Sequence, residues 1–367
     1  MSFLQKNKLI FLSIILLIII LPSEVFATGI SKSKKSKIPD ISDMVLIYHG
    51  GTQRPVWNTD QLRSYLYRQN SGNLEWLFDG FLFLEIFDNI QNYEYDHYDT
   101  AFGYRTAGKK QWYGLLNRYF GEQKGPDALE ILLDSLSKKG KSPIRKRQVV
   151  LSIPFPVYKF TEWGELNGKK LNFNNTDDQV KAVCWFIDEA LKIWNKKNYK
   201  HIQLNGFYWV HEDLKQSNAA IPIVKKYLKT KNLNFLWIPY WGAKRKGEGK
   251  RLGFDFAWLQ PNYFFATDIP KKRLNDVCIF AKKHHMGLEM EFDERVSKPE
   301  FRSRFYDYLR IFKENNVWDS FPVAYYEGGG EWMQMANSKD PELKKMFDTL
   351  GNIIVKRQTN ADKCRQK

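Results

Sequence analysis

Cysteine is sparse in this chain of 367 residues, and its few cysteines follow no pattern. Cys184, Cys278 and Cys364 are odd in number and show no paired spacing, which argues against a disulfide framework and a cysteine zinc site. Cys184 and Cys278 fall among apolar residues with helical spacing, so we expect small buried hydrophobes there. The sequence also lacks an internal repeat, a glycine-rich phosphate loop after a strand and a serine-hydrolase elbow motif, so none of these classes is indicated.

Long hydrophobic runs are missing as well, apart from one near the amino terminus. Lys6 and Lys8 precede an apolar run over residues 9–21, which is shorter than the ~20 residues that a membrane-spanning helix needs. Pro22, a turn and Val25-Phe26-Ala27 follow, with the small residue Ala27 at the expected cleavage position. This order is typical of a secretory signal peptide, so residues 1–27 predict a cleaved signal and a secreted or periplasmic protein with no membrane contact afterwards. An uncleaved anchor is the alternative.

The rest of the chain divides into a basic linker, one large domain and a basic tail. Residues 28–40 are polar and rich in lysine, so they cannot bury a core and predict a flexible linker. Residues 41–355 are long for one core but lie within the range of α/β barrels. Residues 356–367 are predicted to form the tail.

Positive charge exceeds negative charge, with 57 Lys and Arg against 41 Asp and Glu and a formal net charge of +16. Such a field favours an acidic polysaccharide, a nucleic acid or a membrane surface as partner. The basic residues are mostly lysines spread along helical stretches, so a solvated surface explains them equally well. We expect a carbohydrate partner, anionic glycans included, and neither nucleic acid nor membrane. The sequence does not determine the oligomeric state.

Short apolar runs alternate with amphipathic segments along the domain, which predicts a parallel sheet. The eight predicted strands are residues 44–48, 80–84, 148–153, 202–209, 234–238, 254–259, 286–291 and 321–325. Helical spacing marks residues 128–139, 177–197, 223–229, 271–284 and 299–315. Two helices also fit between the second and third strands, whereas residues 242–253 leave only a rudimentary fifth helix. We predict an α/β fold, a single-domain (β/α)8 TIM barrel, with a doubly wound open sheet as the alternative.

The active site of such a barrel lies at the carboxyl ends of its strands, where acids and aromatic residues gather in this sequence. Glycoside hydrolysis needs such a set, because one carboxylic acid protonates the leaving oxygen while a second carboxylate attacks the anomeric carbon or activates water. Besides two catalytic candidates, the predicted substrate-binding residues are His49, Glu85, Tyr208, Trp209, His211, Tyr240, Trp241, Gln260, Asn262, Tyr263, Glu289, Asp293, Tyr326 and Glu327. The segment 86–104 at the same end is dense in Tyr, Asp and Asn.

The seventh strand carries the sharpest pattern. Glu289, Glu291 and Asp293 alternate with apolar residues, so all three acids point to one face of the strand. Unpaired carboxylates are costly to bury against helices, so this face belongs to the barrel interior or its mouth. Glu291 lies nearest the strand end and is the candidate nucleophile or base, with Glu289 a sugar-binding or supporting group one layer deeper. A buried ion-pair network is the alternative.

Glu212 is the candidate general acid, because it follows the aromatic end of the fourth strand. Its alternative role is a charge at a helix start. His49 precedes two glycines, which suggests close approach to a ligand, although a lone histidine is more often structural. No metal and no cofactor is expected: the acids of the seventh strand are hard oxygen ligands, but no histidine-rich spacing accompanies them.

Several short motifs occur in an order that resembles the domain-of-unknown-function 4855 family. They are Gly206-Phe207-Tyr208-Trp209 before Glu212, Gln260-Pro261-Asn262-Tyr263, Gly287-Leu288-Glu289-Met290-Glu291-Phe292-Asp293, Asp79-Gly80-Phe81 and Ile153-Pro154-Phe155-Pro156. The resemblance covers roughly residues 44–355 and implies a secreted bacterial protein similar to glycosidase barrels, without naming a substrate. A looser similarity is to retaining glycosidases that carry the acid after the fourth strand and the nucleophile after the seventh. Their usual Asn before the acid is His211 here.

Three functions follow as hypotheses. The first is a glycoside hydrolase of the retaining kind, with Glu212 as acid/base and Glu291 as nucleophile. The second is a non-catalytic carbohydrate-binding barrel. The third is a basic surface protein that binds anionic polymers through charge, and its binding would weaken steeply with salt.

Overall fold

The computed structural model describes residues 40–49, 54–88, 92–97, 103–214 and 219–366. The predicted signal peptide and nearly all of the predicted linker lie outside the described residues. So do the two glycines after His49. Among the described helices, none combines the length and the apolar character that a membrane span requires.

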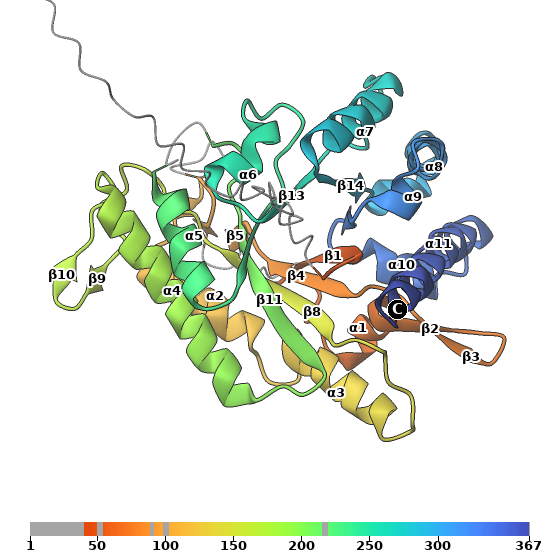
Figure 1. Ribbon diagram of the computed structural model, residues 1–367, viewed down its shortest axis with the longest axis horizontal. Coiled ribbons are helices and arrows are strands. Elements are labelled where there is room, and N and C mark those ends of the chain that lie inside the picture. Colours follow the sequence, from red (N-terminus) through yellow and green to blue (C-terminus); the bar gives the residue numbers. More distant parts are fainter. Residues whose placement is uncertain (1–39, 50–53, 89–91, 98–102, 215–218, 367) are drawn as a thin grey trace, which may run out of the picture. The chain divides into compact units, whose positions relative to one another are not determined.

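Eight parallel strands close into a barrel (Figure 1). In chain order they are β1 (Asp43–Tyr48), β4 (Gly80–Leu84), β8 (Arg147–Ile153), β11 (Ile202–Trp209), β12 (Asn234–Trp237), β13 (Phe256–Leu259), β14 (Gly287–Glu291) and β15 (Val323–Tyr326). Each strand pairs with its neighbours in chain order, and β15 pairs with β1. The predicted (β/α)8 barrel is therefore confirmed, and the open sheet is excluded because β1 and β15 close the ring.

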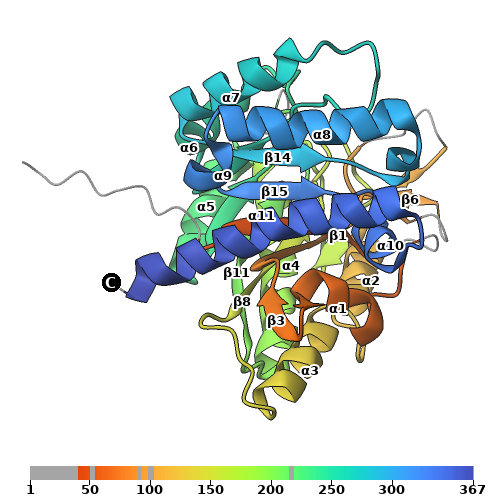
Figure 2. The ribbon, with the colours of Figure 1, turned by 90° about the vertical axis from the view of Figure 1, so that its right-hand side faces the viewer.

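Helices surround the strands, as Figures 1 and 2 show. They are α1 (Thr59–Leu66), α2 (Lys109–Tyr119), α3 (Pro126–Ser137), α4 (Thr176–Lys197), α5 (Ala220–Thr230), α6 (Gly249–Leu252), α7 (Lys272–His284), α8 (Pro299–Glu314), α9 (Val317–Ser320), α10 (Glu331–Asn337) and α11 (Pro341–Gln366). Between β12 and β13 there is only the short α6 and a 3-10 turn, Lys246–Glu248, as the Lys- and Gly-rich sequence predicted. The side chain of Asn175 caps α4, one residue before the helix starts.

The long segment between β4 and β8 holds the two predicted helices, α2 and α3, and a feature that the sequence did not reveal. Three two-residue strands, β5 (Phe87–Asp88), β6 (Tyr93–Glu94) and β7 (Arg105–Thr106), form a small sheet. Because this sheet follows the carboxyl end of β4, it places the residues just after β6 beside the barrel mouth. Two further small hairpins are β2 (Tyr67–Asn70) with β3 (Asn73–Trp76), and β9 (Glu165–Leu166) with β10 (Lys169–Lys170).

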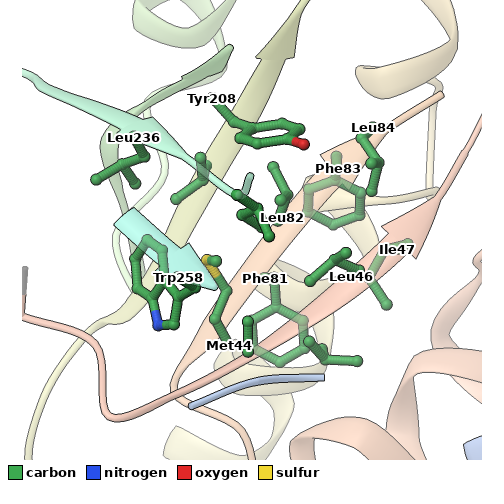
Figure 3. Close-up of a cluster of buried hydrophobic side chains, with 14 of the residues drawn as sticks. Met44, Leu46, Ile47, Phe81, Leu82, Phe83, Leu84, Tyr208, Leu236 and Trp258 are labelled. Carbon is green, nitrogen blue, oxygen red and sulfur yellow. The ribbon is translucent and has the colours of Figure 1, made fainter. Parts of the chain in front are cut away.

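Alternate strand residues fill the barrel with apolar side chains. The register pairs Leu46 with Leu82 and Tyr208 with Leu236. Figure 3 shows these side chains, together with Met44, in one buried cluster. Burial of such side chains contributes roughly 25 cal/mol per Å² of apolar surface removed from water, so this core holds the eight strands in one register.

The amino-terminal end of the barrel is closed by a buried polar cluster around Asp43. Its carboxylate accepts hydrogen bonds from Tyr325 Oη (2.7 Å), Arg357 Nε (2.6 Å) and Gln358 Nε2 (2.8 Å). Arg357 also donates to the carbonyl oxygens of Ser42 and Phe321. The cluster joins β1, β15 and α11. Residues 356–366, predicted as a tail, therefore form the last part of α11, because these buried polar groups find partners at the barrel end.

We expect Arg357→Met to destabilise the protein by about 3–5 kcal/mol, because it leaves the Asp43 carboxylate buried without its cation. The free energy of unfolding in urea measures this. The neighbouring exposed Lys356 provides the matched control, since Lys356→Met is expected to change stability by no more than about 0.5 kcal/mol. Equal stability of the two variants would show that the cluster does not hold α11.

Candidate functional site

A cavity of about 590 Å³ opens at the carboxyl ends of the strands. Its lining residues are Asp96, His97, His211, Glu212, Asp213, Tyr240 and Asn262. A larger hollow of about 790 Å³ lies on the flank, among α1, β2, α10 and α11, and contains none of the predicted site residues. The smaller cavity is the candidate site, because it lies where barrels of this kind carry their function.

Glu212 lies on the wall of this cavity and is half-buried. Gln260 Nε2 donates a hydrogen bond to its Oε1 at 2.7 Å and a second one to the carbonyl oxygen of Ile238. Desolvation raises the pKa of Glu212 to about 8, and the nearby charges of Asp96 and Glu291 raise it further against the effect of the Gln260 bond. At neutral pH this carboxyl group is therefore protonated and can donate a proton.

Glu291, at the end of β14, is 0% exposed and accepts four hydrogen bonds. The backbone N–H of Asn262 donates to Oε1 (2.7 Å). Oε2 accepts from the N–H groups of Tyr263 (2.9 Å) and Phe264 (3.3 Å) and from Tyr308 Oη (2.6 Å). Burial raises its pKa, and these four donors lower it. The carboxylate thus joins the turn that follows β13 to both β14 and α8. This turn lies between Glu291 and the cavity.

Glu289 lies deeper in the barrel and is 2% exposed. Its Oε2 has no hydrogen-bond partner among the described residues. Burial raises the pKa of Glu289 well above its ordinary value, and the charges of Glu291 and Glu212 add to the effect. Burial also raises the pKa of Tyr48 and Tyr208, which face the same interior. The raised pKa favours the neutral form of Glu289, which lies beneath the cavity rather than on its surface.

A chain of hydrogen bonds links the two catalytic candidates. Glu212 accepts from Gln260, whose Oε1 accepts from Asn262 Nδ2 at 3.5 Å, and the backbone N–H of Asn262 donates to Glu291. Glu212 and Glu291 thus lie at the two ends of one hydrogen-bond chain. Of the three glutamates, only Glu291 has several donors that stabilise its anion, so a negative charge resides there most favourably.

The other wall of the cavity is built by Asp96 and His97, which follow β6. Asp96 Oδ1 is 2.7 Å from His211 Nδ1, and its Oδ2 is 3.1 Å from His97 Nδ1. His97 also bonds to Glu94 at 2.9 Å, which raises the pKa of His97 to about 9. His211 stacks on Phe155 at 4.1 Å between ring centroids. The sequence indicated only that segment 86–104 was rich in polar and aromatic residues, and neither Asp96 nor His97 was singled out.

Asp96, His97 and His211 are also the described group that comes closest to a metal site, since their donor atoms lie within 4.8 Å of one another. Tetrahedral zinc keeps its nitrogen and oxygen ligands about 3.3 Å apart. The 2.7 Å contact between Asp96 and His211 is shorter and suits a shared proton. As they stand, these side chains fit a hydrogen-bonded unit better than a zinc site.

Three predicted binding residues are structural instead. His49 is buried, its Nε2 contacts the carbonyl oxygen of Arg118 at 2.6 Å, and burial lowers its pKa to about 4. Trp209 is 0% exposed and packs on Phe155 outside the strands. Tyr263 is 0% exposed beneath Arg304, with its hydroxyl on Asp307. Trp209 points away from the barrel interior because side chains alternate along β11. The backbone N–H of Tyr263 donates to Glu291, and this hydrogen bond holds the Tyr263 segment against the protein.

Three predicted acids are likewise held by neighbouring groups. Glu85 accepts from the backbone N–H of Ile86 and pairs with Arg54 at 3.4 Å. Asp293 caps the 3-10 turn Glu294–Ser297 and pairs with Arg295. Glu327 accepts from Tyr65 Oη and the Trp332 N–H, between α1 and α10. The contacts of Glu85 with Arg54 and of Glu327 with Tyr65 join distant parts of the chain, so strand-end position alone could not reveal them, whereas those of Asp293 are local.

The remaining predicted residues lie at or near the mouth. Tyr240 and Asn262 line the cavity, and Gln260 holds Glu212. Tyr208 lies inside the barrel, and Tyr326 packs edge-on against Tyr48 with ring centroids 5.8 Å apart. Trp241 is half-buried and packs edge-on against Phe280, away from the cavity, while its backbone N–H donates to Asn262 Oδ1 at 3.0 Å.

Glu327→Gln is expected to change how stability depends on pH. Burial raises the pKa of Glu327 to about 8 from an ordinary value of 4.5. The folded protein therefore holds this proton where the unfolded chain has lost it, so the stability that the group contributes falls as pH rises from about 4.5 to 8. Relative to the variant, the wild type is expected to lose up to ~1.4 kcal/mol per pH unit in this window. Urea unfolding at pH 5 and 8 measures the difference, and equal differences at both pH values would contradict it.

The fold resembles several solved structures at low identity. They include a putative α-L-fucosidase from Bacteroides thetaiotaomicron VPI-5482 (12% identity, 89% of this chain and 98% of that chain, TM-score 0.42). A debranching enzyme from Nostoc punctiforme matches with 12% identity over 87% of this chain and 80% of that one, TM-score 0.44. A 3-hexulose-6-phosphate synthase matches with 10% identity over 87% and 99%, TM-score 0.34. Likenesses at this level include glycosidases and synthases and carry no argument about activity.

Among curated proteins, none matches this chain. A protein-family model does match, over residues 43–352, which is nearly the whole described barrel. Its description is "Domain of unknown function (DUF4855)", and the match agrees with the resemblance seen in the sequence motifs. The chain belongs to the DUF4855 family.

Proposed function

We propose that this protein is a glycoside hydrolase in which Glu212 donates the proton. The observation that carries the proposal is the state of Glu212. Its carboxyl group lies on the cavity wall and accepts a hydrogen bond from Gln260, and its pKa of about 8 keeps it protonated at neutral pH. A glycosidic oxygen in the cavity can take this proton as the bond to the anomeric carbon breaks. Tyr240 adds an aromatic ring to the same wall.

Glu291 is the proposed second carboxylate. Its four donors stabilise the anion, and the hydrogen-bond chain through Gln260 and Asn262 places it close to Glu212. In a retaining mechanism it would attack the anomeric carbon, and Glu212 would then take a proton from water to release the sugar. Oε1 of Glu291 accepts a single hydrogen bond, from the backbone N–H of Asn262, and Glu291 is fully buried. Attack by Oε1 therefore requires the turn that carries Asn262 to move aside when the substrate binds.

A carbohydrate-binding barrel without catalysis is the second candidate. One observation favours it: Glu291 is 0% exposed and Glu289 is 2% exposed in this structure, so a sugar in the cavity meets neither. The two candidates differ in turnover and not in binding.

Glu212→Gln is expected to separate the two. Loss of a general acid slows hydrolysis of alkyl or sugar leaving groups by roughly 10²–10⁴. Dinitrophenyl glycosides need no proton at the leaving oxygen, so cleavage of the glycosidic bond in these substrates is spared. The wild-type rate is expected to fall above about pH 8, as Glu212 ionises, and the variant loses this alkaline limb. Values of kcat/KM on paired aryl and alkyl glycosides measure both effects, because kcat/KM reports cleavage of the glycosidic bond and not the later release of the sugar from the nucleophile. Equal losses on both substrates, or an unchanged alkaline limb, contradict the assignment.

Glu291→Gln is expected to abolish turnover of activated and unactivated glycosides alike, because no leaving group replaces a missing nucleophile. An amide cannot accept four hydrogen bonds as a carboxylate does, so a loss of about 1–3 kcal/mol in stability is also expected. Tyr308→Phe removes one of the four donors and keeps the carboxylate, which makes it the matched control for stability. Full activity of the Glu291 variant would remove it from the mechanism. A folded wild type that binds sugars and turns over none of them supports the binding barrel.

A further inference from the structure

A second cavity, of about 450 Å³, lies next to the small sheet that leads to Asp96 and His97, and we call it the basic hollow. It is built from β6, β7, the start of α2 and the segment before β9. The lining residues that matter here are Tyr93, Arg105, Lys109, Lys110, Glu162 and Trp163. The basic hollow shares no lining residue with the candidate site.

The lining of the basic hollow carries more positive than negative charge. Among its described lining residues Glu162 is the only acid. Both oxygens of Glu162 accept hydrogen bonds from Lys170 Nζ, at 3.0 and 3.1 Å, so a lysine outside the lining balances this charge. The excess does not depend on Arg105, because Lys109 and Lys110 remain against an acid that is already paired.

The charges around the hollow cancel one another and leave this excess in place. They comprise two acids with two lysines and one further ion pair, namely Glu162 and Glu165 with Lys169 and Lys170, and Asp178 with Lys181. Lys109 Nζ donates to the backbone carbonyl oxygen of Glu165 at 2.6 Å, and a carbonyl does not cancel its charge. The two lysines of the hollow are therefore the surplus.

These two lysines stand where a positive charge is unfavourable for the fold. Lys109 and Lys110 begin α2, whose first turn contains no acid, and Gly108 before them has no side chain to cap the helix. A Cβ at Gly108 would lie 2.9 Å from the carbonyl oxygen of Trp163, so this close approach excludes a capping side chain. The helix dipole opposes positive charge at this end, and an anion in the hollow would offset both effects.

The basic hollow and the candidate site lie on one short segment. Tyr93, in β6, lines the hollow, and Asp96 and His97, just after β6, line the cavity that contains Glu212. Tyr93 and His97 are four positions apart in the sequence, so their Cα atoms are separated by at most about 14 Å. One glycan chain can therefore occupy both places.

We propose that the basic hollow is a subsite for a uronic acid residue, so that the substrate is an acidic polysaccharide. Its uronate binds at Lys109 and Lys110 while a neutral unit of the same chain lies at Glu212. The proposal rests on the carbohydrate function proposed above. A carboxylate accepts charge-assisted hydrogen bonds from lysine ammonium groups, which a neutral sugar in the hollow cannot match.

A nucleic acid is the other polyanion that such lysines attract. Its phosphates would suit the charge of the hollow, but its backbone offers no glycosidic oxygen to a carboxylic acid at the neighbouring cavity. The short distance between the hollow and Glu212 therefore favours a charged sugar over a phosphate.

Calorimetry with matched hexasaccharides tests the proposal. The probes are hexasaccharides of hyaluronan, heparosan and glucuronoxylan, each beside its carboxyl-reduced form, in which alcohols replace the carboxylates. They are titrated at low ionic strength into the Glu212→Gln protein, which prevents cleavage and replaces a protonated carboxyl group by a neutral amide. At least one acidic hexasaccharide is expected to bind about tenfold more tightly than its reduced form, and added salt is expected to weaken this preference.

Lys109→Gln together with Lys110→Gln is expected to lower the preference to about twofold or less, with binding of the reduced form unchanged. Lys110→Gln alone, at an exposed position, is expected to lower it about threefold, and it keeps the test valid if the double variant is unstable. Lys313→Gln together with Lys356→Gln is the matched control. It removes the same net charge from exposed positions on α8 and α11 and is expected to leave the preference unchanged.

Equal binding of the acidic and reduced forms overturns the proposal, and so does the absence of binding by every acidic hexasaccharide. A preference that the control variant lowers as much as the hollow variant overturns it as well, because the whole basic surface then causes it. An oligothymidylate that binds as tightly as the best acidic hexasaccharide, and loses affinity in the hollow variant, identifies a general polyanion site and overturns the substrate.

The hydrolase proposal fails separately, in a protein that keeps Glu212. A preference for an acidic hexasaccharide without release of shorter sugars refutes hydrolysis and supports the uronate subsite. Cleavage of reduced and acidic forms with equal kcat/KM does the reverse.

Discussion

The carboxylate of Glu291 accepts four hydrogen bonds at the end of β14, and the arrangement of the mouth depends on them. Three come from consecutive backbone N–H groups after β13, so the turn that carries Asn262 takes its path from this one side chain. Asn262 then contacts Gln260, and Gln260 holds Glu212. Burying an anion costs free energy unless hydrogen bonds satisfy its oxygens. Here the hydrogen bonds that offset this cost also order the end of the neighbouring strand.

The same constraint separates the roles of three glutamates that lie within reach of one another's charge. Burial and mutual repulsion favour the neutral form of each, and donors are concentrated on Glu291. Burial raises the pKa of all three, and the hydrogen bonds that oppose this effect are most numerous at Glu291, so an anion is stabilised best there. Acid and base chemistry at one pH requires two carboxyl groups whose environments stabilise the anion unequally. The proposed assignment of Glu212 as proton donor follows from this division.

The net charge of the chain does not by itself identify what the cavity binds. The formal net charge of +16 favours an anionic glycan, whereas the cavity is lined by acids and imidazoles. A net charge describes the whole surface and affects encounter at long range, but it does not describe the groups that contact a ligand. The groups that face a bound sugar therefore decide the substrate proposal, and the rest of the basic surface remains a separate property of the helices and loops.

The sequence by itself determined the barrel, because the strands and helices are set by local periodicity: residues 202–209 form β11 as predicted, and the rudimentary helix before β13 follows from its Lys- and Gly-rich composition. Motif order also gave the family, which the family model confirms. Which strand-end residues face the cavity was decided only by the tertiary structure. Trp209 and Tyr263 are buried in packing, His49 bonds to Arg118, and Asp96 and His97 arrive from a small sheet. These outcomes depend on contacts between segments far apart in the chain, and no local pattern encodes such contacts.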